Sequence, residues 1–287
     1  MIWYYAVRKK KGKNMQVTTL VTDGYVTIPY PQSLRVRVHE AMQSWKNFCA
    51  LPIEEKRKLS GGDRVSDFGY MRREDTGPRV DDKELFHVVK NEMSRLHTKV
   101  VTVSDQRAVR FIDAVETLRK ESAPFIQEFA QAVEQEYQLN GLEEAVANSQ
   151  HNWTFRYLHY FPGKRPSLAN AHADRGGFTF HLWEDHVGGE YFDFDREWHP
   201  WSVSETKTII FPSMGLQYFS HCALKALWHR IVPNKITETT GRYSMVAFID
   251  FNMSHRFDDN QYRMQNFEPG FNYNMPFRDF KKLFVPR

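Results

Sequence analysis

The chain has 287 residues, 41% of them hydrophobic and 15% aromatic, a composition that excludes a disordered or fibrous protein. Its 39 Lys and Arg against 35 Asp and Glu leave a net charge of only +4, which argues against a nucleic-acid-binding surface. The length suits one elaborated domain.

The N-terminal residues carry much of that excess charge, in the basic run from Arg8 to Lys13. We interpret residues 1–23 as a flexible basic extension. The apolar opening precedes this run, which is the reverse of the order in a signal peptide, and no later apolar stretch approaches the length of a membrane span. Cys49 and Cys222 stand far apart without a CxxC spacing, so we expect a cytoplasmic protein without disulfides.

The first half of the chain predicts helices. A helix is expected from Ser33, ending at Leu51-Pro52, with a second short helix from Pro52. Residues 61–82 lack periodicity and predict an irregular loop that borders a pocket. A long helix is expected with Ser104 as its N-cap and a kink at Pro124. The apolar positions expected to face inward in the first helix are Val36, Val38, Met42, Trp45 and Phe48.

After about residue 150 the pattern changes to short strands separated by turns, for example residues 153–157 and 208–211. Helices followed by evenly spaced strands predict an α+β fold whose second half is an antiparallel sandwich or barrel, as in a jelly roll. We therefore divide the chain into residues 24–150, a helix-rich region that packs on the core, and residues 151–287, the core with a C-terminal helix. Together they are expected to form one catalytic unit.

The most informative motif is His172-Ala173-Asp174, followed by His229. Residues two apart in a strand point to the same side, so His172 and Asp174 project together if their segment is extended. His229 follows the apolar residues 226–228, which predict a neighbouring strand. Two imidazoles and one carboxylate can occupy one face of an octahedral metal and leave three positions open, which is the arrangement of non-haem Fe(II) oxygenases.

A second motif is Arg242-Tyr243-Ser244. The same alternation places Arg242 and Ser244 on one face of a strand. A guanidinium offers two parallel donors to a carboxylate and a neighbouring hydroxyl can donate another hydrogen bond, so this face can hold the far end of a dicarboxylate.

Neither motif is specific alone, because the chain has 12 histidines and a strand with two polar residues on its solvent face is ordinary. An alternative metal cluster is His186 with Glu184 and Asp185. We interpret His181, His199 and His221 as surface or core histidines. The aromatic residues that could line a dry site are more typical of core packing: Trp153, Phe155, Phe178, Phe180 and Trp228.

The combination of motifs resembles the iron(II)/2-oxoglutarate-dependent dioxygenases, in particular the isopenicillin N synthase-like family. The resemblance covers nearly the whole chain after about Gly24, in the family's order and spacing. The segments that carry it are FCALP at 48–52, GY at 69–70, DKELF at 82–86, HYFP at 159–162, HADRGGFTF at 172–180, WED at 183–185, GGEY at 188–191, EWHPWSV at 197–203, the stretch 210–220 followed by HC, LWHRIVPN at 227–234 and GRYSMVAFIDF at 241–251.

This resemblance implies a double-stranded β-helix in which His172, Asp174 and His229 bind Fe(II), while Arg242 and Ser244 hold the C5 carboxylate of 2-oxoglutarate. The co-substrates would be 2-oxoglutarate and O2, and the products succinate and CO2. In the family the residue before the proline of the HYFP-like stretch is often a tyrosine that touches the co-substrate, with an asparagine two residues earlier. Here Phe161 and His159 stand at those positions, which predicts the loss of one hydroxyl.

Three functions stay open at this point. The first is hydroxylation, desaturation or ring formation on a small organic substrate, since the presence of Asp174 does not favour halogenation. The second is an Fe(II) oxidase of the isopenicillin N synthase type, independent of 2-oxoglutarate, and the third is a non-catalytic jelly-roll binding protein. We expect a small-molecule substrate and neither nucleic acid nor membrane as a partner.

The substrate itself is not identified by these motifs. Substrate contacts are predicted at Tyr70, Arg72, Arg73 and the segment 277–284. A small acidic metabolite fits these residues, and so does a peptide or a nucleobase. The sequence carries no signature of an oligomeric state.

Overall fold

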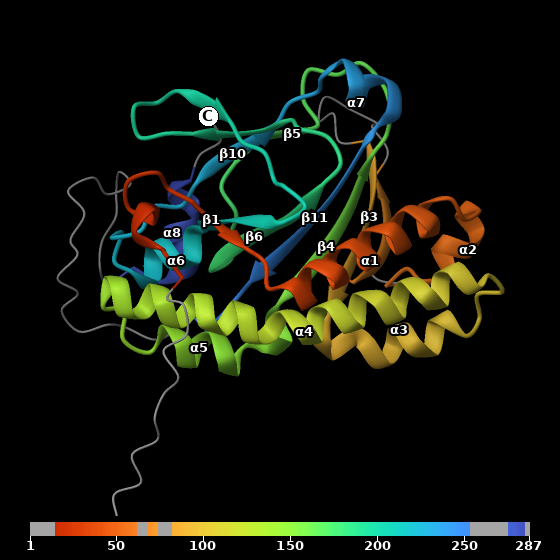
Figure 1. Ribbon diagram of the computed structural model, residues 1–287, viewed down its shortest axis with the longest axis horizontal. Helices are drawn as coiled ribbons and strands as arrows, with labels where there is room; N and C mark the ends of the chain where they lie inside the picture. The colour runs from red at the N-terminus through yellow and green to blue at the C-terminus, as the bar shows by residue number, and fades with distance from the viewer. Residues whose placement is uncertain (1–14, 62–67, 74–81, 253–274, 285–287) are drawn as a thin grey trace, which may run out of the picture.

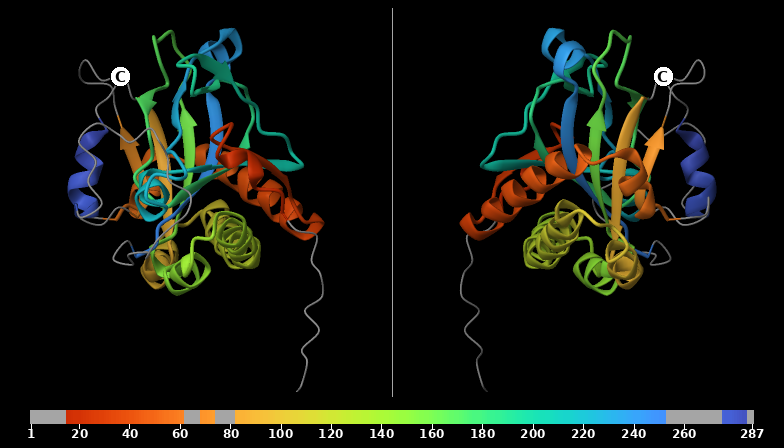
Figure 2. Two further views of the ribbon diagram at one scale, coloured as in Figure 1. Left: turned by 90° about the vertical axis from the view of Figure 1, so that its left-hand side faces the viewer. Right: turned by 90° about the vertical axis from the view of Figure 1, so that its right-hand side faces the viewer.

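The computed structural model describes residues 15–61, 68–73, 82–252 and 275–284. Two antiparallel β-sheets face each other, and a layer of helices covers the outer side of the larger one (Figures 1 and 2). This is an α+β arrangement with a jelly-roll core, as the sequence predicted. The helices are α1 (Gln32–Cys49), α2 (Ile53–Lys58), α3 (Met93–Val100), α4 (Gln106–Tyr137), α5 (Leu142–Asn148), α6 (Met214–Phe219), α7 (Lys235–Thr240) and α8 (Phe277–Phe280), with 3-10 turns η1 (Thr18–Leu20), η2 (Lys90–Glu92), η3 (Gln150–Asn152) and η4 (Lys281–Leu283).

The larger sheet has the strand order β1-β9-β6-β11-β4-β3-β2, and the smaller one has the order β5-β10-β7-β8. Strands from both sides of residue 150 contribute to the larger sheet, because β1, β2 and β3 precede that residue. The strands are β1 (Val26–Pro29), β2 (Gly69–Arg73), β3 (Lys83–Val89), β4 (Thr154–Tyr160), β5 (Ala169–His172), β6 (Phe178–Glu184), β7 (Gly189–Phe192), β8 (Trp198–Pro200), β9 (Lys207–Pro212), β10 (Trp228–Ile231) and β11 (Arg242–Ile249).

An aromatic cluster joins the helical layer to the larger sheet. Trp45 of α1 packs on Phe111 of α4 at a ring-centroid distance of 5.3 Å and on Tyr157 of β4 at 6.1 Å. The Trp45 indole also donates a hydrogen bond of 3.2 Å to the carbonyl of Leu158. Buried aromatic side chains of this size contribute much of the free energy of folding, so this cluster fixes α1 against the strands that carry the functional site.

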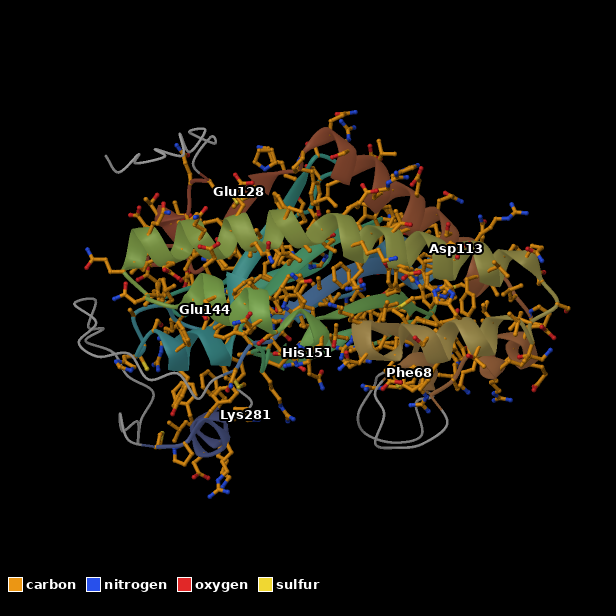
Figure 3. All side chains as sticks on the ribbon, turned by 90° about the horizontal axis from the view of Figure 1, so that it is seen from below. Phe68, Asp113, Glu128, Glu144, His151 and Lys281 are labelled. Atoms are coloured by element: carbon orange, nitrogen blue, oxygen red, sulfur yellow. The ribbon has the colours of Figure 1, made fainter. Side chains whose placement is uncertain are left out.

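The helical layer is amphipathic. Seen from below, α4 and α5 carry the exposed acidic residues Asp113, Glu128 and Glu144 on the side away from the sheet (Figure 3). Among the described residues, no helix combines the length and the apolar composition needed to cross a membrane.

Several local predictions were wrong. Val36 is 45% exposed, whereas the other four apolar positions predicted for the inward stripe of α1 are buried. The N-cap of α4 is Asp105, whose carboxylate accepts a hydrogen bond from the Arg107 N–H, and not Ser104. The predicted loop at residues 61–82 contains β2, and its parts 62–67 and 74–81 lie outside the described residues.

The predicted flexible extension is also shorter than expected. Val17 and Leu20 are 2% and 0% exposed and belong to the main hydrophobic core. The Tyr137 hydroxyl donates a hydrogen bond of 2.7 Å to the Val17 carbonyl. Residues 15–23 therefore pack on the domain, and the remainder of the predicted extension, residues 1–14, lies outside the described residues.

Candidate active site

The three residues of the predicted metal site meet between the two sheets. His172 ends β5, Asp174 follows two residues later, and His229 lies on β10, directly opposite His172 in the antiparallel register. Nε2 of His172 is 3.6 Å from Oδ1 of Asp174, and Nε2 of His229 is 3.8 Å from Oδ2. The three potential ligand atoms all lie within 4.8 Å of one another.

Backbone carbonyls orient both imidazoles. Nδ1 of His172 lies 2.7 Å from the Asn170 carbonyl, and Nδ1 of His229 lies 3.1 Å from the Leu227 carbonyl. A carbonyl oxygen can only accept a hydrogen bond, so each Nδ1 carries the proton. The lone pair of each Nε2 therefore points to the shared centre, which is the tautomer that a metal ligand requires.

Asp174 is held by a hydroxyl that the sequence motifs did not reveal. Thr179 of β6 donates a hydrogen bond of 2.7 Å to Oδ2 of Asp174, and its hydroxyl lies 3.1 Å from that of Ser213. The Asp174 carbonyl accepts a hydrogen bond of 2.8 Å from the Met214 N–H. Side chain and backbone are thus both fixed, which predefines the direction of the carboxylate.

The protonation states follow from burial and mutual charge. Burial and the neighbouring His172 lower the pKa of His229 to about 4, so this imidazole is neutral at physiological pH. Burial alone would raise the pKa of Asp174, but His229, His172 and Thr179 hold it well below its ordinary value. Burial would lower the pKa of His172, yet the hydrogen bond to Asp174 and its charge leave it above the ordinary value.

This donor set fits a divalent metal. Ligand atoms about 2.1 Å from one metal and at right angles to each other lie about 3 Å apart, so separations of 3.6 and 3.8 Å require only a small contraction. His229 is 9% exposed, whereas the side chain of His172 is 47% exposed. The site therefore has one closed side and one open side, as a centre that must admit further ligands needs.

Arg242 and Ser244 lie on one face of β11, as the alternation predicted. Arg242 is 1% exposed and its Nη1 donates a hydrogen bond of 3.1 Å to the Ser244 hydroxyl. Its Nε donates a hydrogen bond of 3.0 Å to the His186 carbonyl. The guanidinium is consequently fixed in the interior, next to the cavity that contains the histidines and Asp174.

The sequence motifs missed the partner of this arginine. Nη2 of Arg242 donates to Oε2 of Glu184, and Oε1 of Glu184 accepts a hydrogen bond of 3.0 Å from the Val203 N–H. Burial would raise the pKa of Glu184, but His181, whose Nε2 lies 3.4 Å from Oε2, and the charge of Arg242 lower it to about 2. The ionised Glu184 therefore offsets the positive charge of Arg242.

Lys83 brings a further cation to the same cavity of about 80 Å³. It is 7% exposed, and its Nζ lies 5.2 Å from the ring centre of Tyr160, whose other neighbour in the sheet is Arg242. Lys83 belongs to the DKELF segment at 82–86, for which the resemblance implied no role. Arg156 of β4 also lines this cavity, again without a signal in the motifs.

The position of Tyr160 differs from the prediction for the HYFP stretch, which took residues 159 and 161 as those beside the co-substrate. It is Tyr160 that lines the cavity, whereas Nδ1 of His159 lies 2.8 Å from Glu84 and the His159 ring stacks on Tyr243. Phe161 lies outside the cavity lining, with the Arg72 guanidinium 3.7 Å from its ring centre. The prediction took residue 161 as the inward position, and the structure places this position one residue earlier.

A larger cavity of about 550 Å³ opens beside His172 and Asp174. Phe284 lines it, as predicted for the C-terminal segment, and so does Trp228. The prediction for Tyr70 was wrong, because this residue is 1% exposed and donates its hydrogen bond to Glu84. Arg72 pairs with Asp82 at 3.0 Å, and neither Arg72 nor Arg73 is among the lining residues.

The alternative metal cluster at residues 184–186 does not form. Glu184 pairs with Arg242, and Asp185 pairs with Lys46 at 3.1 Å and accepts a hydrogen bond from the Tyr243 N–H. Within the described ranges, one other group has metal-ligand spacing, formed by Cys49, Glu84 and His159. The Lys56 ammonium lies 2.6 Å from Glu84 there, so a cation already occupies this position.

Residues 150–251 match the family model of the 2OG-Fe(II) oxygenase superfamily. This part of the chain is a 2OG-Fe(II) oxygenase domain. The matched stretch contains His172, Asp174, His229, Arg242 and Ser244. This superfamily uses Fe(II), 2-oxoglutarate and O2, so the matched domain is that of an oxidoreductase of this type.

Solved structures share the fold. A 2OG-Fe(II) oxygenase family protein from Caulobacter crescentus is 23% identical, with a TM-score of 0.67 over 82% of this chain and 79% of that one. A full-length Neurospora crassa protein in complex with alpha-KG is 18% identical, with a TM-score of 0.65 over 82% and 78%. The dioxygenase for auxin oxidation from rice is 18% identical, with a TM-score of 0.62 over 81% and 75%. No curated protein matches the chain.

Proposed function

We propose that this oxygenase binds Fe(II) through His172, Asp174 and His229 and oxidises a small organic substrate. For hydroxylation the balance is R–H + O2 + 2-oxoglutarate → R–OH + succinate + CO2, with one oxygen atom of O2 in each of the two oxidised products. The observation that carries the proposal is the convergence of two correctly oriented Nε2 atoms and one carboxylate.

Bound iron would supply the activation of O2, which no side chain can perform. The chain's own contribution is placement. The carbonyls of Asn170 and Leu227 fix the two imidazoles, and Thr179 fixes the carboxylate. These three residues would hold the metal on one side and would leave room on the other for co-substrate and O2.

Arg242 and Ser244 are proposed to bind the far carboxylate of 2-oxoglutarate. Their hydrogen bond and the contact of Arg242 with the His186 carbonyl define the direction of the donors before any ligand arrives. Because Glu184 offsets the charge of Arg242, a buried dianion needs another cation nearby. Lys83, which lines the same cavity, is proposed to supply it.

The decisive experiment is reconstitution with Fe(II) under anaerobic conditions, followed by titration with 2-oxoglutarate. We expect an Fe(II)–2-oxoglutarate charge-transfer band, and succinate release on addition of O2. His229→Ala should abolish both, whereas His151→Ala, which removes an exposed histidine (Figure 3), should change neither.

Two results would contradict this function. Unchanged metal uptake by the His229→Ala variant would refute the assignment of the ligands. Oxygen uptake that ignores 2-oxoglutarate would support the oxidase alternative, in which Arg242 and Ser244 bind a carboxylate of the substrate itself.

We further propose that residues 24–287 act as one catalytic unit in the cytoplasm. The larger sheet combines strands from both sides of residue 150, which supports a single catalytic unit. Cys49 and Cys222 are both buried free thiols, which is compatible with a reducing compartment. Limited proteolysis that released a folded fragment cut near residue 150 would contradict the single unit.

A further inference from the structure

The large cavity beside His172 and Asp174 has an apolar part and a charged part. Its volume of about 550 Å³ is in the range of small-molecule sites. The apolar lining comes from Met214, Trp228, Phe248 and Phe284, and the cationic lining comes from Arg156 and Arg175. This combination suits a ligand with an apolar body and an anionic group.

Arg156 is the cation in the better position to recognise such a group. It lies on the inward face of β4 and lines both the large cavity and the smaller cavity that contains His229 and Arg242. It is half-buried, whereas Arg175 is exposed. Arg156 therefore stands where the substrate space meets the metal ligands.

A hydrogen bond and an aromatic contact orient the Arg156 guanidinium. Its Nε donates a hydrogen bond of 2.5 Å to Nε2 of His87, a residue that is 0% exposed. Its guanidinium carbon lies 4.6 Å from the ring centre of Phe248. A planar cation on an aromatic ring presents a flat surface, and the hydrogen bond to His87 through Nε fixes the direction of the guanidinium.

Two carboxylates, Asp174 and Asp250, also line the large cavity. Asp174 belongs to the proposed metal centre and accepts the hydrogen bond of Thr179. Asp250 packs against the backbone at Gly176, where an added Cβ would lie only 2.2 Å from its Oδ1. Arg156 and Arg175 balance these two carboxylates, and of the two cations Arg156 is the one that also lines the cavity of the metal ligands, so an anionic group of a ligand is favoured beside it.

We propose that the substrate is a small organic acid whose carboxylate binds Arg156 and whose apolar part lies against Phe248, Trp228 and Phe284. This inference rests on the proposed function, because it places the oxidised carbon next to the metal held by His172 and Asp174. A guanidinium binds the two oxygens of a carboxylate in parallel, and neither an amide nor an ester offers the same charge-assisted pair.

The test uses the full-length protein reconstituted anaerobically with Fe(II) and 2-oxoglutarate. The probes are matched pairs of arylalkanoic acids and their primary amides, such as phenylacetate with phenylacetamide and 3-phenylpropionate with its amide. Binding is read from the perturbation of the Fe(II)–2-oxoglutarate band, so turnover is not required. We expect at least one acid to bind about ten- to a hundredfold more tightly than its amide.

The variant Arg156→Gln should lose this preference for the acid, and Arg156→Lys should retain part of it. The matched control is Arg95→Gln, which also removes an arginine lying on a phenylalanine, here Phe68 at 4.5 Å, but on the helical side of the molecule. The control should keep the wild-type preference. Circular dichroism of each variant checks that the fold is retained.

Equal binding of acids and amides by the wild type, or an undiminished preference in a folded Arg156→Gln variant, would overturn the inference. So would binding of a neutral planar compound such as thymine when no acid perturbs the band at millimolar concentration. Each of these results leaves the proposed function standing, because the band itself has formed. A wild-type protein that forms no band at all would overturn the proposed function and this inference together.

Discussion

Glu84 lies at the centre of a buried polar network behind the active-site strands, and its removal gives the most quantitative prediction. Its side chain is 1% exposed. Oε2 accepts hydrogen bonds from Lys56 at 2.6 Å and from the Tyr70 hydroxyl at 2.9 Å, and Oε1 lies 2.8 Å from Nδ1 of His159. The network links α2, β2, β3 and β4, so it supports the strands that carry Lys83 and Arg156.

The magnitude follows from the protonation equilibrium of Glu84. Burial would raise its pKa, but His159, Lys56 and Tyr70 lower it from the ordinary 4.5 to about 2. A difference of about 2.5 pKa units corresponds to about 3 kcal/mol of folding free energy at neutral pH. Because the folded-state pKa is depressed, this contribution is present above pH 4.5 and decreases as the pH falls toward 2.

The perturbation is Glu84→Gln, and the assay is equilibrium unfolding in urea between about pH 7 and pH 3. At neutral pH we expect a loss of about 3–5 kcal/mol, since the variant leaves the buried Lys56 without its carboxylate. The difference between wild type and variant should shrink by about 2 kcal/mol between about pH 6 and pH 3. Glu116→Gln, at a partly exposed ion pair with Lys120, should cost less than about 1 kcal/mol.

A loss below about 1 kcal/mol for Glu84→Gln at neutral pH would refute the reasoning. A difference that stays constant over the whole pH range would refute it as well, because the effect would then arise from packing and not from charge.

Further predictions concern the site itself. Thr179→Val removes the donor to Asp174 and should weaken Fe(II) affinity about ten- to a hundredfold in metal-competition assays; unchanged affinity would show that the hydroxyl is not needed. Lys83→Met should raise the Kd for 2-oxoglutarate, measured from the charge-transfer band, by about tenfold or more, while Lys83→Arg should raise it less; equal affinities would remove Lys83 from the co-substrate site. Gly177→Ala would place a Cβ 2.0 Å from the Phe251 ring and should cost about 1–3 kcal/mol of stability in urea unfolding, and a neutral effect would contradict the close approach.

The sequence predicted the residues of the site better than their surroundings. His172 and His229 could be selected because they lie on predicted strands, and Asp174 because it follows His172 by two residues; the alternation along a strand identified Arg242 and Ser244. The N-cap of α4 was missed because Ser104 and Asp105 are both suitable N-cap residues. The exposure of Val36 was missed because both Val36 and Val38 fit the apolar stripe of α1. Whether a residue at the edge of a helix face is buried depends on the element that packs against it, and the local periodicity of the sequence does not identify that element.

Two further cations of the cavity, Lys83 and Arg156, could not be predicted, because a charge acquires its role from its neighbours across the sheet. Lys83 and Arg156 lie in one β-sheet with Arg242, on β3, β4 and β11, yet 73 residues separate the first two along the chain. Lys83 and Arg242 flank Tyr160 only because β3 and β11 pair with β4 in this register. Without the register, Lys83 and Arg156 look like an ordinary surface lysine and arginine.

The pairing of Glu184 with Arg242 depends on an irregularity that alternation cannot predict. Residues 181 and 184 are an odd number apart, so in a regular strand they would face opposite sides of the sheet. In β6 the register shifts, with Ser244 opposite Glu184 and Val246 opposite His181. This extra residue turns both side chains to the same side, where His181 and Glu184 lie 3.4 Å apart. One inserted residue thus brings a carboxylate to Arg242, and this neutralisation is the reason why we propose Lys83 as a second cation for the co-substrate.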